Sequence, residues 1–390
     1  MKIELLSKAQ SLKSEVLRIK EKIDKSIDYN EVLKKWIEYK PSSRYVPAAA
    51  EDGSFNKKYY LGFYLYAVAG FSNMYIEEKD GEGRFIDEFV GDINLSVIKN
   101  TNFVDTYFRN LMFLAELKAL LNLAEREKPK LLILDGTLSS RYISILPKTN
   151  WFISEEFEGQ LFDIAISYTD ILKENLNNRE PLTFNKDFHN EVKDKLISTF
   201  GKLKGDRKDI FEAVISKIAY FEYLLLLHKL LKGLDWNPLV IGVAKTSTLT
   251  EIFNSSIPDI KIFSSFTQSS GYSIKMQVNL EGKKWEFAEK FEAIEKNIEI
   301  ELRDVIIDYF YCKLRDGRDI LLVELYENPE FTADYSPEDI MDMLSYYSVG
   351  NYPFLLTRAD KEVRITKKDM DLIEDILGLK YELTGREALI

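Results

Sequence analysis

Two aspartates in the sequence have the same short context, in which glycine and then a hydroxyl residue follow directly. Asp135 comes after the apolar run Leu131–Leu134, and Asp52 lies just before an aromatic-rich segment. A short apolar run bounded by turn residues is typical of a buried strand, and the ends of such strands are where α/β proteins place much of their chemistry. Both aspartates are therefore candidate functional carboxylates. For Asp135 the alternative is that it only starts a turn after the strand.

A third carboxylate, Glu116, lies in a segment with the periodicity of a helix, residues 101–128. Successive helical residues are about 100° apart, so Glu116 lies about 200° from Lys118 on the polar stripe and is expected on the buried face. An unpaired carboxylate there would cost several kcal/mol, so Glu116 needs a cationic partner. A metal ion is one candidate, because the Asp135 strand follows next. A buried Arg or Lys, or hydrogen bonds to the carboxylate, is the alternative.

Asp52, Glu116 and Asp135 together predict an acidic cluster of the kind that binds one or two divalent cations. Such ions generate hydroxide and stabilise the attacking and leaving oxygens at a phosphodiester. The chain has one cysteine, Cys312, and two histidines, so any metal would be held mainly by oxygen atoms. Oxygen ligands favour Mg²⁺ or Mn²⁺. These residues point to metal-assisted hydrolysis.

Other phosphate-handling motifs are absent from the sequence. Haloacid dehalogenase-type phosphatases need a nucleophilic aspartate two residues before the Asp-Gly-Thr aspartate, and position 133 is Ile. Neither the nucleotide-binding pattern G-x-x-x-x-G-K-[ST] nor the dinucleotide pattern G-x-G-x-x-G occurs. The acidic cluster is therefore the chemistry that the sequence supports.

The elements that must hold these residues follow from hydrophobic periodicity. A strand is predicted at Tyr59–Phe71, with Gly62 and Gly70 as possible bulges. The buried strand Leu239–Val243 is followed by Lys245. The Lys245 ammonium suits a phosphate contact. The alternative is a solvated lysine in a loop. Further strands are expected within Phe85–Ile98, Ile298–Tyr311 and Ile320–Tyr326, and further helices at Lys208–Lys232, Pro337–Ser348 and Lys367–Leu377.

A long amphipathic helix is predicted at residues 3–28. Apolar residues recur there in steps of three and four, from Leu5 to Ile27, with Lys and Glu between them. This apolar stripe packs either on the protein's own domain or on a partner helix across a dimer. Residues 151–206 are charged and are predicted to form a helical insertion.

Composition sets bounds on the protein class. The 390 residues are 45% hydrophobic and 30% charged, which suits a packed globular protein. The net charge of −11 argues against a nucleic-acid coat protein but not against an enzyme with one local basic groove. No run of 18 apolar residues and no signal peptide occur, so we expect a cytoplasmic protein without a membrane partner. Four glutamines, one cysteine and abundant Lys, Glu and Ile are typical of a hyperthermophile.

With these residues identified, the chain resembles the NurA nuclease family of archaea and some bacteria. The resemblance covers nearly the whole chain apart from residues 151–206. It rests on the long N-terminal helix and on motifs in a fixed order: Asp52-Gly53-Ser54, Glu116, LLILDGTL ending at Leu138, GVAKTS around Lys245, and a terminal segment from Gly350 to Asp360.

The resemblance implies one NurA-like domain over residues 1–390, with a helical arm at 1–40 and an insertion at 151–206. It implies an RNase H-like core, that is, a mixed β-sheet flanked by helices. It also implies a Mn²⁺-dependent (or Mg²⁺-dependent) nuclease with single-strand endonuclease and 5′-to-3′ exonuclease activity. Such proteins are usually dimers that process single-stranded and duplex DNA ends for recombinational repair with the hexameric HerA translocase. The alternative is a NurA-like subunit that binds DNA or HerA without cutting.

Site residues carried over from the family are Asp52, Glu116 and Asp135 as metal ligands, with Tyr352 near the active site. One position departs from the family pattern. The family usually has a His at the position aligned with Asp360, so either the metal set is all carboxylate or the protein is a weakened paralogue. Residues expected to meet DNA phosphates are Arg141, Lys245 and Arg358.

Overall fold

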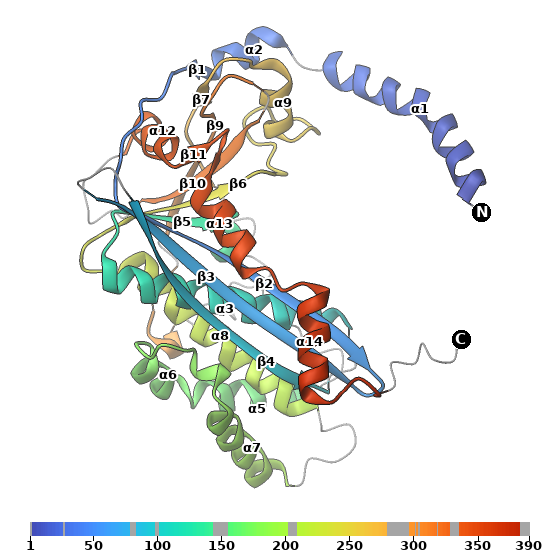
Figure 1. Ribbon diagram of the computed structural model, residues 1–390, viewed down its shortest axis with the longest axis vertical. Helices are drawn as coiled ribbons and strands as arrows, with labels where there is room; N and C mark the ends of the chain where they lie inside the picture. The colour runs from blue at the N-terminus through green and yellow to red at the C-terminus, as the bar shows by residue number, and fades with distance from the viewer. Residues whose placement is uncertain are drawn as a thin grey trace.

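The computed structural model describes residues 2–25, 28–78, 83–97, 101–142, 155–201, 209–278, 296–300, 302, 305–317, 319–327 and 335–382. Its centre is a mixed sheet (Figure 1). Within these ranges the sheet has ten strands in the order β1-β7-β9-β10-β6-β5-β2-β3-β4, with β8 beside β9. Strands β2, β5 and β6 are parallel neighbours, and the strand pairs on either side of them, β6–β10, β2–β3 and β3–β4, are antiparallel. The predicted mixed α/β sheet is confirmed.

The strands of the described chain, including the small separate pair β11–β12, are β1 (Trp36–Glu38), β2 (Ala48–Tyr60), β3 (Phe63–Glu77), β4 (Gly83–Ser96), β5 (Leu131–Asp135), β6 (Leu239–Ala244), β7 (Gly271–Ser273), β8 (Met276–Gln277), β9 (Ile306–Lys313), β10 (Leu321–Glu327), β11 (Ser348–Val349) and β12 (Tyr352–Pro353). The helices are α1 (Lys2–Lys25), α2 (Tyr29–Lys34), α3 (Thr101–Glu127), α4 (Leu138–Tyr142), α5 (Glu155–Ile166), α6 (Thr169–Asn175), α7 (Lys186–Phe200), α8 (Asp209–Lys232), α9 (Asp259–Phe266), α12 (Pro337–Tyr346), α13 (Phe354–Val363) and α14 (Lys367–Leu377).

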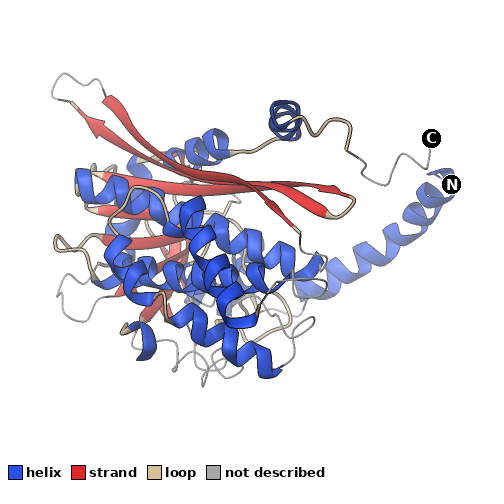
Figure 2. Cartoon of the chain, turned by 90° about the horizontal axis from the view of Figure 1, so that it is seen from below, coloured by secondary structure: helices blue, strands red, loops and turns tan. Residues whose placement is uncertain are grey.

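Helices cover both faces of the sheet (Figure 2). On one face α3 packs on β2, β3 and β4, and α8 packs on α3. Because strand side chains alternate between faces, Ala49, Leu132 and Leu134 join that larger core. Ala50 and Ile133 join a second core on the opposite face, with apolar residues of α12 and α13.

The predicted N-terminal helix is confirmed as α1, which extends away from the sheet (Figure 1). Its apolar side chains Ile3, Leu5, Leu6 and Leu12 are exposed. Residues 155–200 are largely helical, as predicted, and α5, α6 and α7 pack on α8; the ends of the predicted insertion lie outside the described residues. Across the described ranges, every helix is too short or too polar to span a membrane.

The predicted strand Tyr59–Phe71 is a hairpin instead. The chain turns after Tyr60, where Gly62 has a φ of +111° that a residue with a side chain rarely adopts. Asp52 therefore lies inside β2 and not before the strand. Gly70 is not a bulge, because it pairs with Gly53 in an unbroken register. A Cβ on Gly70 would lie 2.2 Å from the Ala115 backbone of α3, so glycine is needed for this close helix approach.

Several other predictions meet smaller corrections. Strand β9 begins at Ile306, so residues 298–300, 302 and 305 of the predicted strand Ile298–Tyr311 are not in a strand, and the residues between them lie outside the described ranges. Helix α13 was not predicted. Lys118 is buried and not on a solvent stripe, because the segment just after α6 lies against this part of α3: the Lys118 ammonium donates to the Leu176 carbonyl at 2.5 Å, and the Asn122 side chain donates to the Arg179 carbonyl.

Candidate active site

Asp52 and Asp135 lie side by side on two parallel strands. The register of β2 and β5 pairs Glu51 with Leu134, so the next step along both strands brings Asp52 beside Asp135. Neighbouring strands are about 4.8 Å apart. Both aspartates share the sheet face of Ala50 and Ile133, because strand side chains repeat every two residues. The two predicted carboxylates are therefore brought together, at the carboxyl end of β5.

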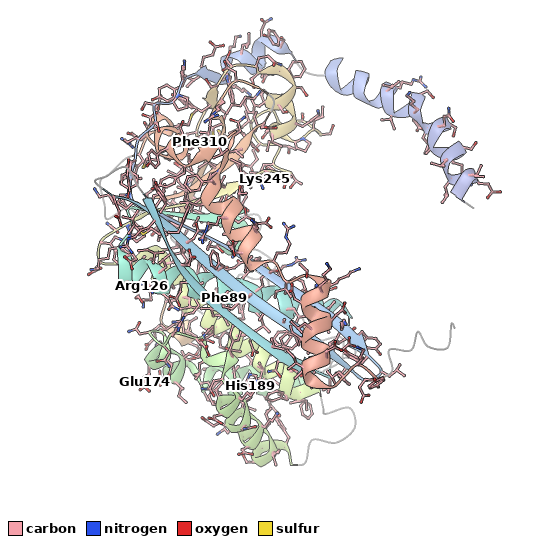
Figure 3. All side chains as sticks on the ribbon, in the orientation of Figure 1. Phe89, Arg126, Glu174, His189, Lys245 and Phe310 are labelled. Carbon is pink, nitrogen blue, oxygen red and sulfur yellow. The ribbon has the colours of Figure 1, made fainter. Side chains whose placement is uncertain are left out.

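Tyr352 and Lys245 complete this side of the site. The Tyr352 hydroxyl donates a hydrogen bond to Asp135 Oδ1 at 2.7 Å. The Lys245 ammonium, at the end of β6 (Figure 3), lies 3.7 Å from the centre of the Tyr352 ring. One aromatic ring thus connects a carboxylate that is a candidate metal ligand to an exposed cation that is a candidate phosphate contact.

The electrostatics of the pair favour a bound cation. Burial, then the charges of Asp135 and Asp360, raise the pKa of Asp52 to about 7. Burial also raises the pKa of Asp135, although the Tyr352 hydrogen bond and Lys245 oppose the rise. Raised carboxylate pKa values mean that negative charge here is not fully compensated. Strongly perturbed groups in one location mark candidate functional sites.

A second carboxylate pair lies on the opposite sheet face and holds Arg141. The Arg141 Nη2 atom donates to Glu51 Oε1 at 2.9 Å, and Nη1 donates to Glu116 Oε2. Nη2 also donates to the Asp135 carbonyl at 3.1 Å, and the guanidinium lies 4.5 Å from the Phe113 ring centre. Glu51 and Glu116 are 0% and 1% exposed, so this is an ion triad inside the core.

One arginine cannot neutralise two buried carboxylates. Burial raises the pKa of Glu51 to about 8, even though the Arg141 charge lowers it. The Glu51 Oε2 atom is buried and has no hydrogen-bond partner in the part of the chain that the structure describes. The whole region therefore carries more carboxylate than cationic charge.

Glu116 reaches the triad because Gly53 leaves room for it. A Cβ on Gly53 would lie 2.0 Å from Glu116 Oε1. The glycine after Asp52 therefore admits the carboxylate of α3 to the sheet surface on the face of Glu51. This is a packing role for Gly53 in the Asp-Gly-Ser motif.

The predicted site residues are thus divided between two groups. Asp52, Asp135 and Tyr352 lie together. Glu116 is buried as predicted. Its cationic partner is Arg141, so the alternative of a buried arginine holds here and not the metal ion. Asp360 is exposed and accepts from Arg364 Nη2 at 2.5 Å, while its charge acts on both aspartates. Among the described residues, no group of three or more His, Cys, Asp or Glu side chains is arranged to hold a metal ion as it stands.

The three predicted DNA contacts differ in their surroundings. Lys245 is exposed at the site, which suits the prediction. The prediction for Arg141 is wrong, because its guanidinium is buried and held by two carboxylates. Arg358 is half-buried over the Phe85 ring and pairs with both oxygens of Asp87, so its guanidinium is already engaged. Glu51 was not predicted, although its place next to Asp52 in a buried strand was a usable signal.

Two cavities open beside the site, on either side of the loop that follows β6. One, of about 720 Å³, is lined by Lys245, Lys261 and Tyr352 among others. The other, of about 580 Å³, is lined by Arg109 of α3 and by hydroxyl residues such as Thr137 and Ser247. Both cavities reach the carboxyl ends of the parallel strands, where open α/β sheets bind ligands.

The residues present suit a hard divalent cation. The donor atoms of Asp52 and Asp135 are all oxygen, which is the ligand type that Mg²⁺ and Mn²⁺ prefer. Burial is the main cause that raises the pKa of both aspartates, and a bound cation would stabilise their charged forms against it.

Comparison with known proteins matches the chain to one family model, the NurA domain, over residues 47–365. The chain is 28% identical over 381 residues to the probable DNA double-strand break repair nuclease NurA of Methanocaldococcus jannaschii, covering 94% of this chain and 87% of that protein. A crystal structure of the NurA nuclease from Sulfolobus solfataricus has a TM-score of 0.64 at 21% identity, covering 97% of this chain and 96% of that one. A crystal structure of NurA with manganese has a TM-score of 0.66 at 19% identity, covering 96% and 99%. These two structures share the fold of this chain.

Proposed function

The chain belongs to the NurA family, and on that premise we propose that it is a divalent-metal-dependent nuclease that hydrolyses phosphodiester bonds in DNA. The observation that carries the proposal is the Asp52–Asp135 pair, with its raised pKa values and its place at the carboxyl end of a parallel strand. The name of the M. jannaschii relative, a probable DNA double-strand break repair nuclease, supports DNA as the substrate.

In this proposal Asp52 and Asp135 hold the ion. The exposed Asp360, whose charge acts on both aspartates, is the further carboxylate expected to contribute. Glu116, the other predicted ligand, would join them only if its carboxylate left Arg141 on the opposite sheet face. A bound Mn²⁺ or Mg²⁺ activates water and stabilises charge on the phosphodiester oxygens. The crystal structure of a family member with manganese supports Mn²⁺ as the first metal to test.

Chain residues supply orientation and charge around that ion. The hydroxyl of Tyr352 fixes the Asp135 carboxylate by its hydrogen bond. The ammonium of Lys245 lies over the same ring, where it donates a charge-assisted hydrogen bond to a phosphate oxygen of the DNA. Arg141 positions Glu116 and Glu51 from the opposite sheet face.

Several finer points of the family resemblance are part of the proposal. They are single-strand endonuclease and 5′-to-3′ exonuclease action on DNA ends, recombinational repair with a HerA-type translocase, and a cytoplasmic location. The run β4-β3-β2-β5-β6, which carries Asp52 and Asp135, is the part of the sheet proposed as an RNase H-like core. Residues 1–390 are proposed as one domain with an arm at 1–40 and an insertion at 151–206.

The direct test is cleavage of end-labelled single-stranded DNA by the purified protein. We expect cleavage with Mn²⁺ and none with EDTA. A protein that binds this DNA but does not cut it with Mn²⁺ or Mg²⁺ would instead be the non-cutting DNA- or HerA-binding subunit.

Asp360 is expected to set the balance between metals. An aspartate in place of the family histidine makes the site all oxygen, which favours Mg²⁺ relative to Mn²⁺. We therefore expect Asp360→Ala to lower the cleavage rate in both metals and Asp360→His to shift the preference toward Mn²⁺. Rates with each metal check this. An unchanged rate for Asp360→Ala would place Asp360 outside the site, and a large gain for Asp360→His would identify a weakened paralogue.

The apolar surface of α1 is expected to form a dimer. Leu5 and Leu12 are 61% and 52% exposed and lie one heptad apart, as in a helix that packs on a second copy. Light scattering is expected to give a dimer for the natural chain and a monomer for the double variant Leu5→Glu, Leu12→Glu. Lys13→Glu on the same helix is the control. A natural chain that is already monomeric would rule out this dimer.

A further inference from the structure

The 720 Å³ cavity beside Tyr352 has the size and the lining of a ligand site. Small-molecule pockets span roughly 300–1,000 Å³ and combine an apolar lining with a few placed polar groups. Here the apolar part comes from Ile260 of α9 and from Ile320 and Leu321 at the start of β10. Charged groups stand at its ends.

The cavity is continuous with the candidate active site. Tyr352 lines the cavity, and its hydroxyl also donates a hydrogen bond to Asp135 Oδ1. Lys245 lines the cavity and lies on the same ring. A molecule bound in the cavity would therefore lie next to the candidate metal-binding aspartates, with Tyr352 between them.

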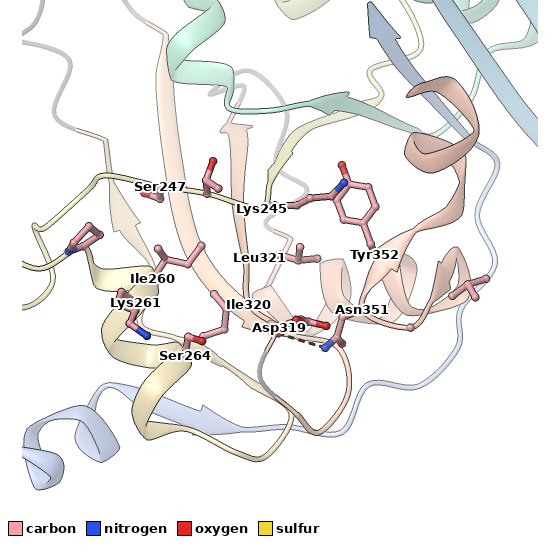
Figure 4. A pocket seen from close by; sticks show the side chains of 14 residues that line it. Lys245, Ser247, Ile260, Lys261, Ser264, Asp319, Ile320, Leu321, Asn351 and Tyr352 are labelled. Atoms are coloured by element: carbon pink, nitrogen blue, oxygen red, sulfur yellow. Dashed lines mark hydrogen bonds between the residues drawn. The ribbon is translucent and has the colours of Figure 1, made fainter. Parts of the chain in front are cut away.

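Two lysines mark opposite ends of the cavity. In Figure 4, Lys245 lies beside Tyr352 at one end and Lys261 lies at the other, with Ile260 and Leu321 between them. Both lysines are exposed. Over the described ranges, neither ammonium is in an ion pair, so both are available to an anion.

One carboxylate also lines the cavity, and its charge is already partly balanced. Asp319 acts on the buried Lys313, where its charge opposes the lowering of the lysine pKa by burial. Asn351 is also engaged, because its side-chain nitrogen donates to the Asp319 carbonyl at 3.3 Å and its oxygen accepts from the Arg315 backbone at 2.8 Å. The cavity thus offers two exposed cations around an apolar middle.

We propose that this cavity binds the nucleotide next to the scissile phosphodiester, with the nucleoside against Ile260, Ile320 and Leu321 and its two flanking phosphates at Lys245 and Lys261. The proposal rests on the nuclease function proposed above and adds the substrate segment that the site recognises. A nucleoside within a strand has a phosphate on each side, which matches a cation at each end of an apolar cavity. Such contacts position the strand without reading its sequence.

The test uses two small ligands that differ by one phosphate. Thymidine 3′,5′-bisphosphate and thymidine 5′-monophosphate compete with a fluorescein-labelled oligothymidylate for the full-length protein in EDTA, where no cleavage occurs. The bisphosphate is expected to compete about tenfold better, since one charge-assisted contact of this kind contributes about a factor of ten.

Lys261→Ala is expected to remove the advantage of the bisphosphate. The control is Lys195→Ala. Lys195 is an exposed lysine of α7 that does not line the cavity, so this variant should keep the advantage of the bisphosphate. An added variant, Ile260→Trp, fills the apolar middle and should weaken both ligands together. Thermal unfolding of each variant checks that the fold is retained.

Equal competition by the two ligands in the natural chain, or an advantage that survives Lys261→Ala, would overturn the proposal. Because the binding assay contains no divalent metal, it is separate from the cleavage assay. A bisphosphate advantage without cleavage in Mn²⁺ would keep the nucleotide pocket and reject the nuclease function. Cleavage in Mn²⁺ without a bisphosphate advantage would keep the nuclease function and reject the nucleotide pocket.

Discussion

Arg141→Met is expected to lower the free energy of unfolding by about 3–5 kcal/mol, the loss typical when one partner of a buried ion pair is removed. The substitution leaves Glu51 and Glu116 inside the core without their cation. Urea unfolding of the metal-free protein at neutral pH measures the loss. Arg364→Met, which removes an exposed guanidinium that pairs with Asp360, should leave the free energy unchanged.

The decrease in the free energy of unfolding caused by Arg141→Met should depend on pH. Burial already raises the pKa of Glu51 to about 8, and removing the guanidinium raises it further. When a carboxyl has a higher pKa in the folded protein than in the unfolded chain, the free energy of unfolding falls as the pH rises from the unfolded-state pKa toward the folded-state pKa. The destabilisation should therefore be smaller at pH 5, where the Glu51 carboxyl is protonated, than at pH 8. Adding Glu51→Gln and Glu116→Gln to Arg141→Met should restore part of the stability, and no recovery would contradict a buried triad.

Asp52→Asn and Asp135→Asn are each expected to reduce DNA cleavage at least about a thousandfold. Loss of a metal ligand removes several kcal/mol of transition-state stabilisation, and each ~1.4 kcal/mol is about a factor of ten in rate. The rate of release of labelled nucleotides in Mn²⁺ measures this. The control is Asp105→Asn, which changes an exposed carboxylate that pairs with Lys57 and should cut as the natural chain does.

The same two variants should not be less stable than the natural chain when metal is absent. The pKa of Asp52 is raised to about 7, so ionisation of this group reduces stability as pH rises from about 4 to 7. Asparagine cannot ionise, and removing one charge also relieves repulsion within the pair. Thermal midpoints in EDTA at pH 8 should stay level or rise. A variant that cuts normally would remove that aspartate from the site.

Much of the site could be predicted because its signals are local. The apolar run before Asp135 predicted β5, and the helical period around Glu116 predicted both α3 and the burial of that carboxylate. Local patterns of this kind depend on residues within one turn or one strand. The family motifs then connected Asp52 to the same site.

The partner of Glu116 could not be predicted because it is a long-range contact. Arg141 lies 25 residues from Glu116 and 90 from Glu51 in sequence, and nothing in the short segment around it distinguishes a buried guanidinium from one that meets DNA. The need of Glu116 for a cation was the available clue. It indicated a partner but did not identify which cation.

The hairpin and the cavity proposed to bind a nucleotide were missed for a related reason. The aromatic alternation from Tyr59 to Phe71 continues through the turn, so only the positive φ of Gly62 separates β2 from β3. Lys261 is an isolated lysine in an ordinary helix, and it becomes a candidate only when α9 is placed across a cavity from Lys245.

The measurement that tests the central claim most directly is Mn²⁺ binding to the natural chain and to the two aspartate variants. Titration of metal-free protein, followed by the electron paramagnetic resonance signal of free Mn²⁺, reports binding without any need for cleavage. If Asp52 and Asp135 hold the ion, the natural chain binds Mn²⁺ and both Asp52→Asn and Asp135→Asn lose at least about tenfold in affinity, as expected when a metal-site residue is removed, while Asp105→Asn does not. Unchanged Mn²⁺ affinity in both aspartate variants would contradict the proposed metal site.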